Sequence, residues 1–198
     1  MANPHPEARQ EIELIKRCQK GDREAFGSLA ETYRRPIFSL VFHLVHRRDE
    51  VEDIVQEIFI KAFVAIRGYN FQSSFRTWLS RIAINHCYDY LRRNRVSRIT
   101  YFWQMGEESE RRIESGGEGR KPGPHGHEDQ LALADLVDKL LARAPVEDRI
   151  ILTLKELEDR SVEEIAGISG LKPSTVKVRL HRARKRMLKD YKKWRRGG

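Results

Sequence analysis

Apolar residues recur at three- and four-residue spacing along most of the chain, which is the period of an α-helix with one buried face. In the N-terminal half this pattern is interrupted at Gly21, at Pro36, which is expected to open a new helix, and at Gly68. The blocks between them predict helices over about 11–20, 22–33, 37–45, 49–66 and 74–95. Asp22 is expected to cap the second of these, and Trp78, Ile82, Ala83 and Tyr90 are expected to form the buried stripe of the last. Because the alternating pattern of a strand is not sustained anywhere, the fold class is expected to be all-α.

The helical pattern disappears between Gly106 and Gly126, where glycine, proline and charged residues replace apolar ones. Such a segment cannot bury enough apolar surface to offset the entropy lost on ordering. We therefore expect a flexible linker over 97–127 that joins two small helical domains, at 9–96 and 128–194. The start of this linker is apolar, which leaves open whether it docks on a partner or folds back on the first domain. Its apolar residues are Tyr101, Phe102, Trp103 and Met105.

The segment from Ser161 to His181 predicts a helix-turn-helix motif made of two short helices. Ser161 and Glu164 have the spacing of a capping box, and Gly170 can supply the positive-φ turn that follows the first helix. Pro173 suits the first turn of the second helix. The second helix has a buried stripe of Val176, Leu180, Ala183 and Met187. Its opposite face can reach a major groove with Lys177, Val178, His181 and Arg182.

Charge favours a nucleic acid as the partner of this motif. The chain has 38 Lys and Arg against 29 Asp and Glu, a net charge of +9. After Glu164 the only acid is Asp190, although basic residues crowd the same stretch. Such a density of one charge repels itself unless a polyanion is bound. This favours DNA binding over the alternative, a solvated basic helix in an ordinary bundle.

Several classes of protein are excluded by what the sequence lacks. It has no run of about 18 apolar residues and no signal-peptide core, so we expect a soluble, cytoplasmic protein. Cys18 and Cys87 stand alone, which predicts neither a zinc site nor a disulfide framework. No nucleophile and base occur in a motif context, and no glycine-rich phosphate loop follows a strand. The expected protein is therefore not an enzyme and needs no cofactor.

Two distant parts of the chain resemble the extracytoplasmic-function group of bacterial sigma factors. Residues 49–63 (DEVEDIVQEIFIKAF) and 75–93 (FRTWLSRIAINHCYDYLRR) resemble conserved region two, and residues 144–188 resemble region four. Two blocks in this order around a variable linker are more specific than either alone. The resemblance implies a subunit that binds core RNA polymerase, recognises −35 and −10 promoter elements and promotes promoter opening. The alternative is a stand-alone helix-turn-helix transcriptional regulator.

The helix predicted over 49–66 carries acids opposite its apolar stripe, and an acidic stripe on a basic protein invites a basic partner. In the sigma family this helix docks on the β′ clamp helices of the polymerase. The resemblance therefore implies core-polymerase contacts by Asp49, Glu52, Asp53, Gln56 and Glu57. The alternative is a solvated face with pairs such as Glu57 and Lys61. A metal site is not expected, because no His stands at ligand spacing within this helix.

The next stretch combines aromatic rings, Phe75 among them, that can stack on unpaired bases with cations that can hold phosphates. In the family, the loop that corresponds to 67–74 forms a pocket for a flipped −10 base. The family's W-x-x-x-I-A-x-N pattern identifies Asn85 as a residue that contacts a base or the DNA backbone. The alternative for Asn85 is a satisfied buried amide, and the alternative for Trp78 is a role in the core. The expected −10 residues are Tyr69, Asn70, Phe71, Ser73, Ser74, Arg76, Trp78, Arg81, Asn85, Arg92 and Arg93.

For the −35 element, the family's T-V-K/R-S-R segment aligns on residues 175–179. The resemblance implies contacts with base edges or phosphates by Lys155, Ser174, Thr175, Lys177, Val178, Arg179, His181, Arg182 and Lys185. Val178 stands where the family usually has Ser, and its methyl groups can touch a thymine methyl but cannot donate a hydrogen bond. The resemblance also implies contact with the polymerase β flap. Many family members are held inactive by an anti-sigma factor, and no sequence mark decides this for the present chain.

Overall fold

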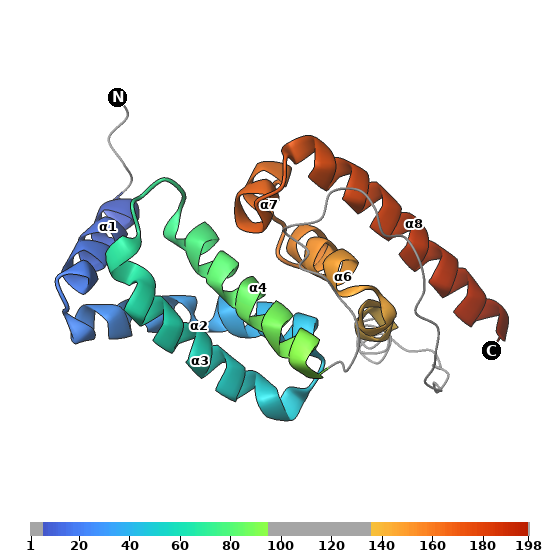
Figure 1. Ribbon diagram of the computed structural model, residues 1–198, viewed down its shortest axis with the longest axis horizontal. Coiled ribbons are helices and arrows are strands. Elements are labelled where there is room, and N and C mark those ends of the chain that lie inside the picture. The colour runs from blue at the N-terminus through green and yellow to red at the C-terminus, as the bar shows by residue number, and fades with distance from the viewer. Residues whose placement is uncertain (1–5, 95–135, 198) are drawn as a thin grey trace. The chain divides into compact units, whose positions relative to one another are not determined.

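The computed structural model describes residues 6–94 and 136–197, and within these ranges every regular element is helical (Figure 1). The chain divides into two compact units, one ending at Asn94 and the other beginning at Arg95. The prediction of an all-α fold is confirmed. The linker predicted over 97–127, with the apolar stretch at its start, lies outside the described residues. Among the residues described, none of the helices has the length and apolar character needed to cross a bilayer.

The described part of the N-terminal unit, residues 6–94, is built from four helices. These are α1 (Pro6–Gln19), α2 (Arg23–Val45), α3 (Val51–Ala65) and α4 (Phe75–Asn94), with 3-10 turns η1 (Arg48–Glu50) and η2 (Ile66–Gly68) at the two ends of α3. Helix α2 packs against the other three, and α3 also packs against α4. The core contains Ile15, Leu44, Ile58 and Ile84, one from each helix, none more than 1% exposed. Burying each such side chain contributes about 1.5–3 kcal/mol, which explains the close packing of the four helices.

Helix α2 begins as predicted but does not end at Pro36. The carboxylate of Asp22 accepts a hydrogen bond from the backbone N–H of Ala25 at 3.0 Å, so Asp22 is the N-cap. The helix then continues through Pro36 to Val45, and the prediction that Pro36 opens a separate helix is wrong. A proline inside a helix costs about 3 kcal/mol. Leu29 before it and Leu40 after it are both 2% exposed, so burial of one continuous stripe offsets this cost.

The buried face of α4 differs from the predicted one. Of the expected inner residues Trp78, Ile82, Ala83 and Tyr90, only Ala83 is fully buried, and the other three are half-buried. The core face consists instead of Phe75, Leu79, Ala83, Ile84, Cys87 and Tyr88. Helix α4 packs against both α2 and α3, so its buried arc is wider than the stripe of a helix with one neighbour.

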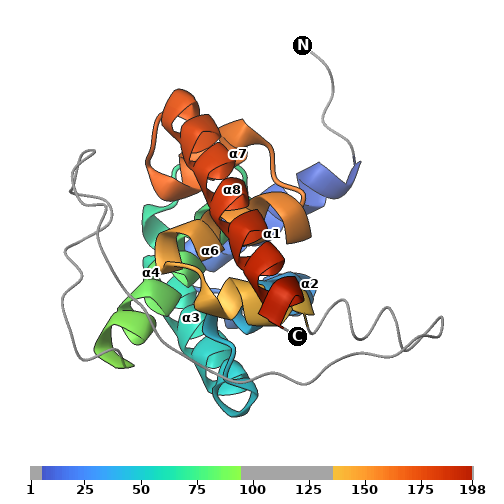
Figure 2. The ribbon, with the colours of Figure 1, turned by 90° about the vertical axis from the view of Figure 1, so that its right-hand side faces the viewer.

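The C-terminal unit contains the predicted helix-turn-helix. Its described elements are a helix over 136–143, α6 (Val146–Leu152), a π-helical turn η3 (Thr153–Leu157), α7 (Val162–Ser169) and α8 (Pro173–Gly197). Figures 1 and 2 show α8 lying along α6 and α7. The buried side chain of Arg149 holds the end of the 136–143 helix by donating to the carbonyls of Leu141 at 2.8 Å and Ala142 at 2.7 Å.

The turn of the motif is confirmed, but its second helix is not short. Ser161 Oγ accepts from the Glu164 N–H at 3.1 Å, and Glu164 Oε2 accepts from the Ser161 N–H at 2.9 Å. Gly170 adopts the left-handed conformation with φ 71°. Helix α8, however, spans 25 residues. No further Gly or Pro occurs before Gly197, at the end of the helix, and its Lys, Arg, Leu and Met residues favour helix.

Removing the capping box is expected to loosen α7. Ser161→Ala should lower the stability of the helix by about 1 kcal/mol, measured by hydrogen exchange of its amides.

The hydrogen bond from the Ser161 N–H holds the pKa of Glu164 below its usual 4.5. A lowered pKa adds stability that is present above pH 4.5 and is lost as the pH falls through the folded-state value. Glu164→Gln should remove this acid dependence, whereas the exposed neighbour Glu163→Gln should leave it in place.

Candidate polymerase and nucleic-acid interfaces

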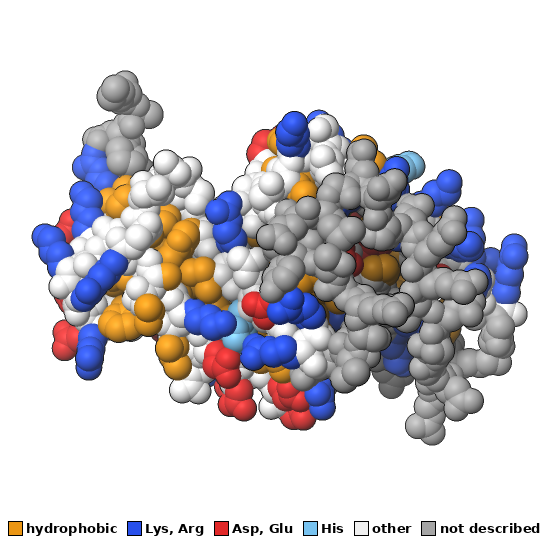
Figure 3. Space-filling view, in the orientation of Figure 1, with side chains coloured by type: hydrophobic (Ala, Val, Ile, Leu, Met, Phe, Trp, Pro, Cys, Tyr) orange, Lys and Arg blue, Asp and Glu red, His pale blue; other side chains and the backbone are white. Residues whose placement is uncertain are grey.

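One face of α3 is acidic and exposed. Glu52, Asp53, Gln56 and Glu57 are all exposed on this helix, whereas Asp49 is exposed on the preceding turn η1. Figure 3 shows acidic side chains gathered along the lower edge of the N-terminal unit, where α3 begins. Acids in the first turn of a helix are favoured by the helix dipole, so Glu52 and Asp53 also stabilise α3. The five predicted residues therefore lie together on one surface.

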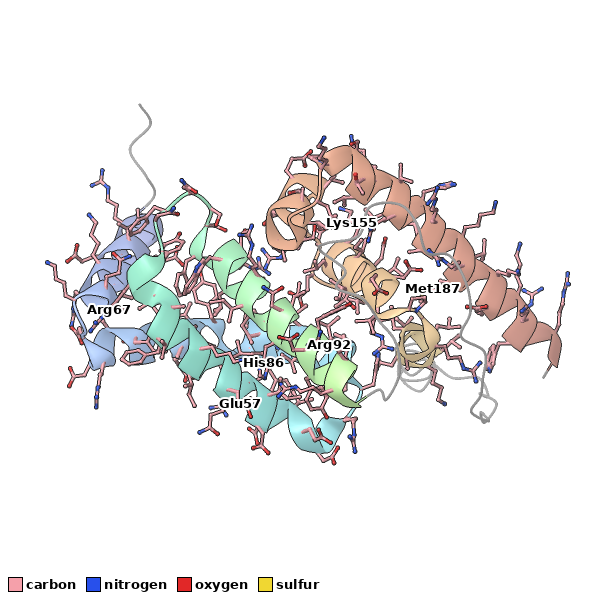
Figure 4. The ribbon with its side chains drawn as sticks, in the orientation of Figure 1. Glu57, Arg67, His86, Arg92, Lys155 and Met187 are labelled. Atoms are coloured by element: carbon pink, nitrogen blue, oxygen red, sulfur yellow. The ribbon has the colours of Figure 1, made fainter. Side chains whose placement is uncertain are left out.

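Glu57 and Lys61 have a common partner that the sequence pattern missed. Lys61 Nζ lies 2.6 Å from Nδ1 of His86, and Glu57 Oε2 lies 3.2 Å from Nε2 of the same ring. Figure 4 shows Glu57 on α3 beside His86 on α4. His86 is 29 positions from Glu57 along the chain, so no helical spacing relates the two residues. Within the described part of the chain no three metal-ligating side chains gather closely enough to hold an ion.

The acidic face continues into two exposed apolar side chains that are not among the residues predicted to contact polymerase. Ile60 is 57% exposed and Val64 is 73% exposed. Positions 53, 57, 60 and 64 lie along one ridge of α3, because they recur at three- and four-residue spacing. The signal was present in the sequence, since these two apolar residues stand outside the buried stripe. This ridge, Asp53–Glu57–Ile60–Val64, is a surface with an acidic half and an apolar half.

In the loop between η2 and α4, the predicted stacking surface is only partly available. The Tyr69 ring is 6% exposed and lies 4.8 Å from the ring of Phe71 and 5.3 Å from that of Trp78. Phe75 is 2% exposed. Both rings are therefore committed to the core in this conformation, where neither is available to stack on a base. Tyr69 instead braces the loop, donating its hydroxyl to the Ser73 carbonyl at 2.6 Å.

Phe71 and Trp78 keep the accessible aromatic surface of this region. Phe71 is 42% exposed and has φ 60°, a left-handed conformation that costs a non-glycine residue about 1–3 kcal/mol. Trp78 is half-buried, so the two roles left open for it, core packing and stacking, are compatible. Asn85 is exposed, so the alternative of a satisfied buried amide is wrong. The other exposed candidates here are Asn70, Ser73, Ser74, Arg76, Arg81 and Arg93, and Arg92 is half-buried.

Helix α1 reaches this loop through one side chain. The amide nitrogen of Gln19 donates to the carbonyl of Tyr69 at 2.6 Å and to that of Ile66 at 3.2 Å. These two carbonyls stand where η2 ends and the loop begins. Gln19 therefore holds the start of the loop in place. Sequence spacing does not reveal this contact, because it joins residues about 50 positions apart.

The exposed face of α8 has the composition expected of a groove-binding helix. Val176 and Ala183 are buried at 0% and 1% exposure, whereas Val178 on the other side is 50% exposed. The predicted residues that share the exposed face with Val178 are Ser174, Lys177, His181, Arg182 and Lys185. Thr175 and Arg179 are half-buried at its edge. Figure 3 shows Lys and Arg side chains along the outer edge of α8.

Lys155, by contrast, is not on α8 but on the π-helical turn. Its side chain is half-buried and donates to the Arg160 carbonyl at 3.1 Å. It also lies 4.0 Å from the carboxylate of Asp159. Lys155 thus braces the chain just before α7, and the structure does not place it on the exposed face of α8.

Two ion pairs hold α8 against the rest of its unit. Arg184 contacts Glu156 Oε1 with Nε at 2.9 Å and Nη2 at 2.7 Å, and Arg186 Nε lies 2.9 Å from Asp148 Oδ2. Asp148 is 6% exposed, and burial raises the pKa of its carboxyl while Arg186 lowers it. Both pairs lie on the flanks of the helix, so the charges that they neutralise are not those of the exposed face.

Comparison with protein families matches both units. Residues 29–96 match the family model of sigma-70 region 2, and residues 134–187 match that of sigma-70 region 4. The first range covers α3, the loop and α4, and the second covers α6, α7 and most of α8. The ridge on α3 and the exposed basic face of α8 thus fall within the two matched segments.

Relatives with curated names cover most of the chain. The chain is 38% identical over 176 residues to the ECF RNA polymerase sigma-E factor of Escherichia coli strain K12, covering 86% of this chain and 88% of the relative. It is 31% identical over 180 residues to the ECF RNA polymerase sigma factor SigW of Bacillus subtilis strain 168, covering 89% and 94%.

Solved structures share the fold. The structure of CnrH in complex with the cytosolic domain of CnrY has a TM-score of 0.66 at 22% identity and covers 92% of this chain and 97% of that one. The sigma factor RpoE of Bartonella quintana, solved with the anti-sigma factor NepR, has a TM-score of 0.60 at 24% identity and covers 84% and 96%. The two family models and the two relatives establish that the chain belongs to the extracytoplasmic-function group of the sigma-70 family.

Proposed function

We propose that this protein is an alternative sigma factor that directs core RNA polymerase to its promoters through three surfaces. A domain over 9–96 binds core polymerase and the −10 element, a linker over 97–127 follows, and a domain over 128–194 binds the −35 element. One observation carries the proposal: the chain combines an exposed acidic ridge on α3 with an exposed basic face on α8, each in the family segment expected for it. No covalent chemistry is assigned to it.

The polymerase contact is assigned to α3 and the turn before it. Charge complementarity between an acidic surface and a basic one speeds association and excludes wrong partners. We assign to this contact Asp49, Glu52, Asp53, Gln56 and Glu57, together with Ile60 and Val64. The two apolar side chains add area that gains from leaving water, about 25 cal/mol per Å² buried. The partner surface expected from the family resemblance is the β′ clamp helices.

The −10 contact is assigned to the loop and the exposed side of α4. Phe71 offers a ring to an unpaired base, worth about 1–3 kcal/mol by stacking. Asn85 lies four residues from Arg81, so these side chains share one face of α4. Within this assignment Tyr69 supports the loop rather than touching the base. A separated strand can be held here through its bases and its phosphates together.

Gln19 is expected to matter for this contact although it touches no DNA in the assignment. Gln19→Leu removes two hydrogen bonds to the loop carbonyls, each worth about 0.5–1.5 kcal/mol. We expect permanganate reactivity of −10 thymines, which reports strand opening by polymerase with this protein, to fall roughly three- to tenfold. Gln10→Leu, the same change at an exposed position of α1, should open the promoter normally. Equal opening by both variants would contradict the role of Gln19.

The −35 contact is assigned to the N-terminal half of α8. Lys or Arg donating to guanine is the commonest specific contact in the major groove, and Val178 can touch a thymine methyl. The ion pairs of Arg184 and Arg186 set the orientation of the helix. The anti-sigma factor named with the Bartonella quintana structure belongs to that protein. For this chain an anti-sigma factor and the β flap contact stay predictions from the family resemblance.

The proposal is tested against the stand-alone regulator by a gel shift with and without core polymerase. Promoter fragments are selected by sequencing transcripts that start only when the protein is added to core polymerase. We expect weak binding by the protein alone and specific binding with core polymerase. Tight, specific binding of the duplex by the protein alone would favour an independent regulator. Transcripts that start no more selectively with the protein than without it would overturn the assignment.

A further inference from the structure

His86 is a buried, titratable side chain for which the proposed contacts so far give no role. It lies on α4 and is 3% exposed, yet both of its ring nitrogens contact charged side chains of α3. Figure 4 shows it next to Glu57, at the junction of the two helices. Glu57 belongs to the ridge assigned to polymerase, and its side chain is 62% exposed. His86 thus connects the interior of the unit to that ridge.

The contacts decide which nitrogen carries the proton. Lys61 Nζ lies 2.6 Å from Nδ1, and an ammonium group can only donate, so Nδ1 must accept. The ring is then neutral, with its hydrogen on Nε2, where it can donate to Glu57 Oε2 at 3.2 Å. Burial and the charge of Lys61 both lower the pKa of His86, which agrees with a neutral ring. The chain of donors therefore runs from Lys61 through His86 to Glu57.

We propose that His86 is a positioning residue that presents the Glu57 carboxylate to core polymerase; this rests on the polymerase contact proposed above. Two effects follow from the geometry. The Nε2–H bond restrains a glutamate side chain whose ordering on binding would otherwise cost up to about 1.5–2 kcal/mol. The ring also engages Lys61 on its opposite side. Lys61 stands four residues after Glu57, a spacing at which the two side chains can pair. Without the His86 ring, Lys61 would therefore pair with the Glu57 carboxylate and mask it.

Three substitutions at position 86 separate this role from simple packing. His86→Gln keeps a donor for Glu57 and an acceptor for Lys61, His86→Asn is too short to serve Glu57, and His86→Met serves neither. We expect His86→Met and His86→Asn to weaken binding to core polymerase roughly five- to tenfold, and His86→Gln to bind within twofold of the parent. Binding is measured with the full chain by fluorescence anisotropy, and thermal unfolding is followed alongside. If His86→Met fails to fold, His86→Asn against His86→Gln carries the comparison.

A double-mutant cycle tests whether His86 acts through Glu57. In a Glu57→Gln background, His86→Asn should cause no further loss of binding. An equal loss in both backgrounds would overturn the proposal, as would parent-like binding by folded His86→Asn or weak binding by His86→Gln. Nitrogen-15 spectra of the free protein add an independent readout: His86 should be neutral with its proton on Nε2, and a proton on Nδ1 would overturn the relay.

Failure here can be told apart from failure of the polymerase assignment. If reversing the charges of Asp53 and Glu57 leaves binding to core polymerase intact, the assigned ridge is wrong. If that reversal abolishes binding while His86→Asn and His86→Met bind normally, the ridge stands and only the role of His86 is rejected.

Discussion

Reversing the charges of Asp53 and Glu57 is expected to weaken binding of core RNA polymerase by about 100-fold. The two acids stand four residues apart on the exposed ridge of α3, so both would face one partner surface. Placing lysines there against a basic partner exchanges attraction for repulsion, which costs several kcal/mol. About 3 kcal/mol corresponds to 100-fold in affinity. Anisotropy of the labelled full chain titrated with core polymerase measures the change.

The control for this double reversal has the same effect on net charge. Glu13→Lys with Glu31→Lys changes two exposed acids on α1 and α2, neither of which belongs to the ridge. This variant should bind within about twofold of the parent, because long-range effects of exposed charge are screened by salt. If both double variants bind core polymerase equally well, α3 is not the contact. Circular dichroism of each variant shows whether it keeps its helices.

Arg182→Ala is expected to lower initiation at promoters with the preferred −35 element by roughly 10- to 100-fold. A bidentate contact to one base is worth about 1–3 kcal/mol of discrimination. Arg182 lies on the exposed face of α8, one turn beyond Val178. The loss should come with relaxed preference at one upstream base pair and unchanged preference at the −10 element. Transcription from a library with randomised −35 positions measures both.

Lys192→Ala is the matched control on the same helix. Residue 192 is also exposed but lies about 15 Å further along the axis than Arg182, at a rise of 1.5 Å per residue. The major groove is only about 12 Å wide, so the far half of a 25-residue helix extends beyond it. We expect less than a twofold change. A loss from Lys192→Ala equal to that from Arg182→Ala would indicate general charge attraction instead of groove recognition.

Local signals in the sequence predicted most of the helices. Asp22, Ser161 and Gly170 each mark a helix end through a backbone requirement that does not depend on distant contacts, and all three are confirmed. Pro36 was misjudged because its local cost is opposed by burial on both sides. The stripe of α4 was misplaced for a related reason: the number of neighbouring helices sets the width of the buried arc, and spacing within one helix does not show that number.

The sequence alone determined the acidic face of α3 and the exposed basic face of α8, since residues three and four apart on a helix must share a side. Which aromatic rings enter the core depends instead on tertiary packing, which buries Tyr69 and Phe75 and leaves Phe71 accessible. It also brought His86 to Glu57 and Gln19 to the loop. The physical reason is that such contacts join residues on different helices, so they depend on how the helices pack, which spacing along one helix does not encode.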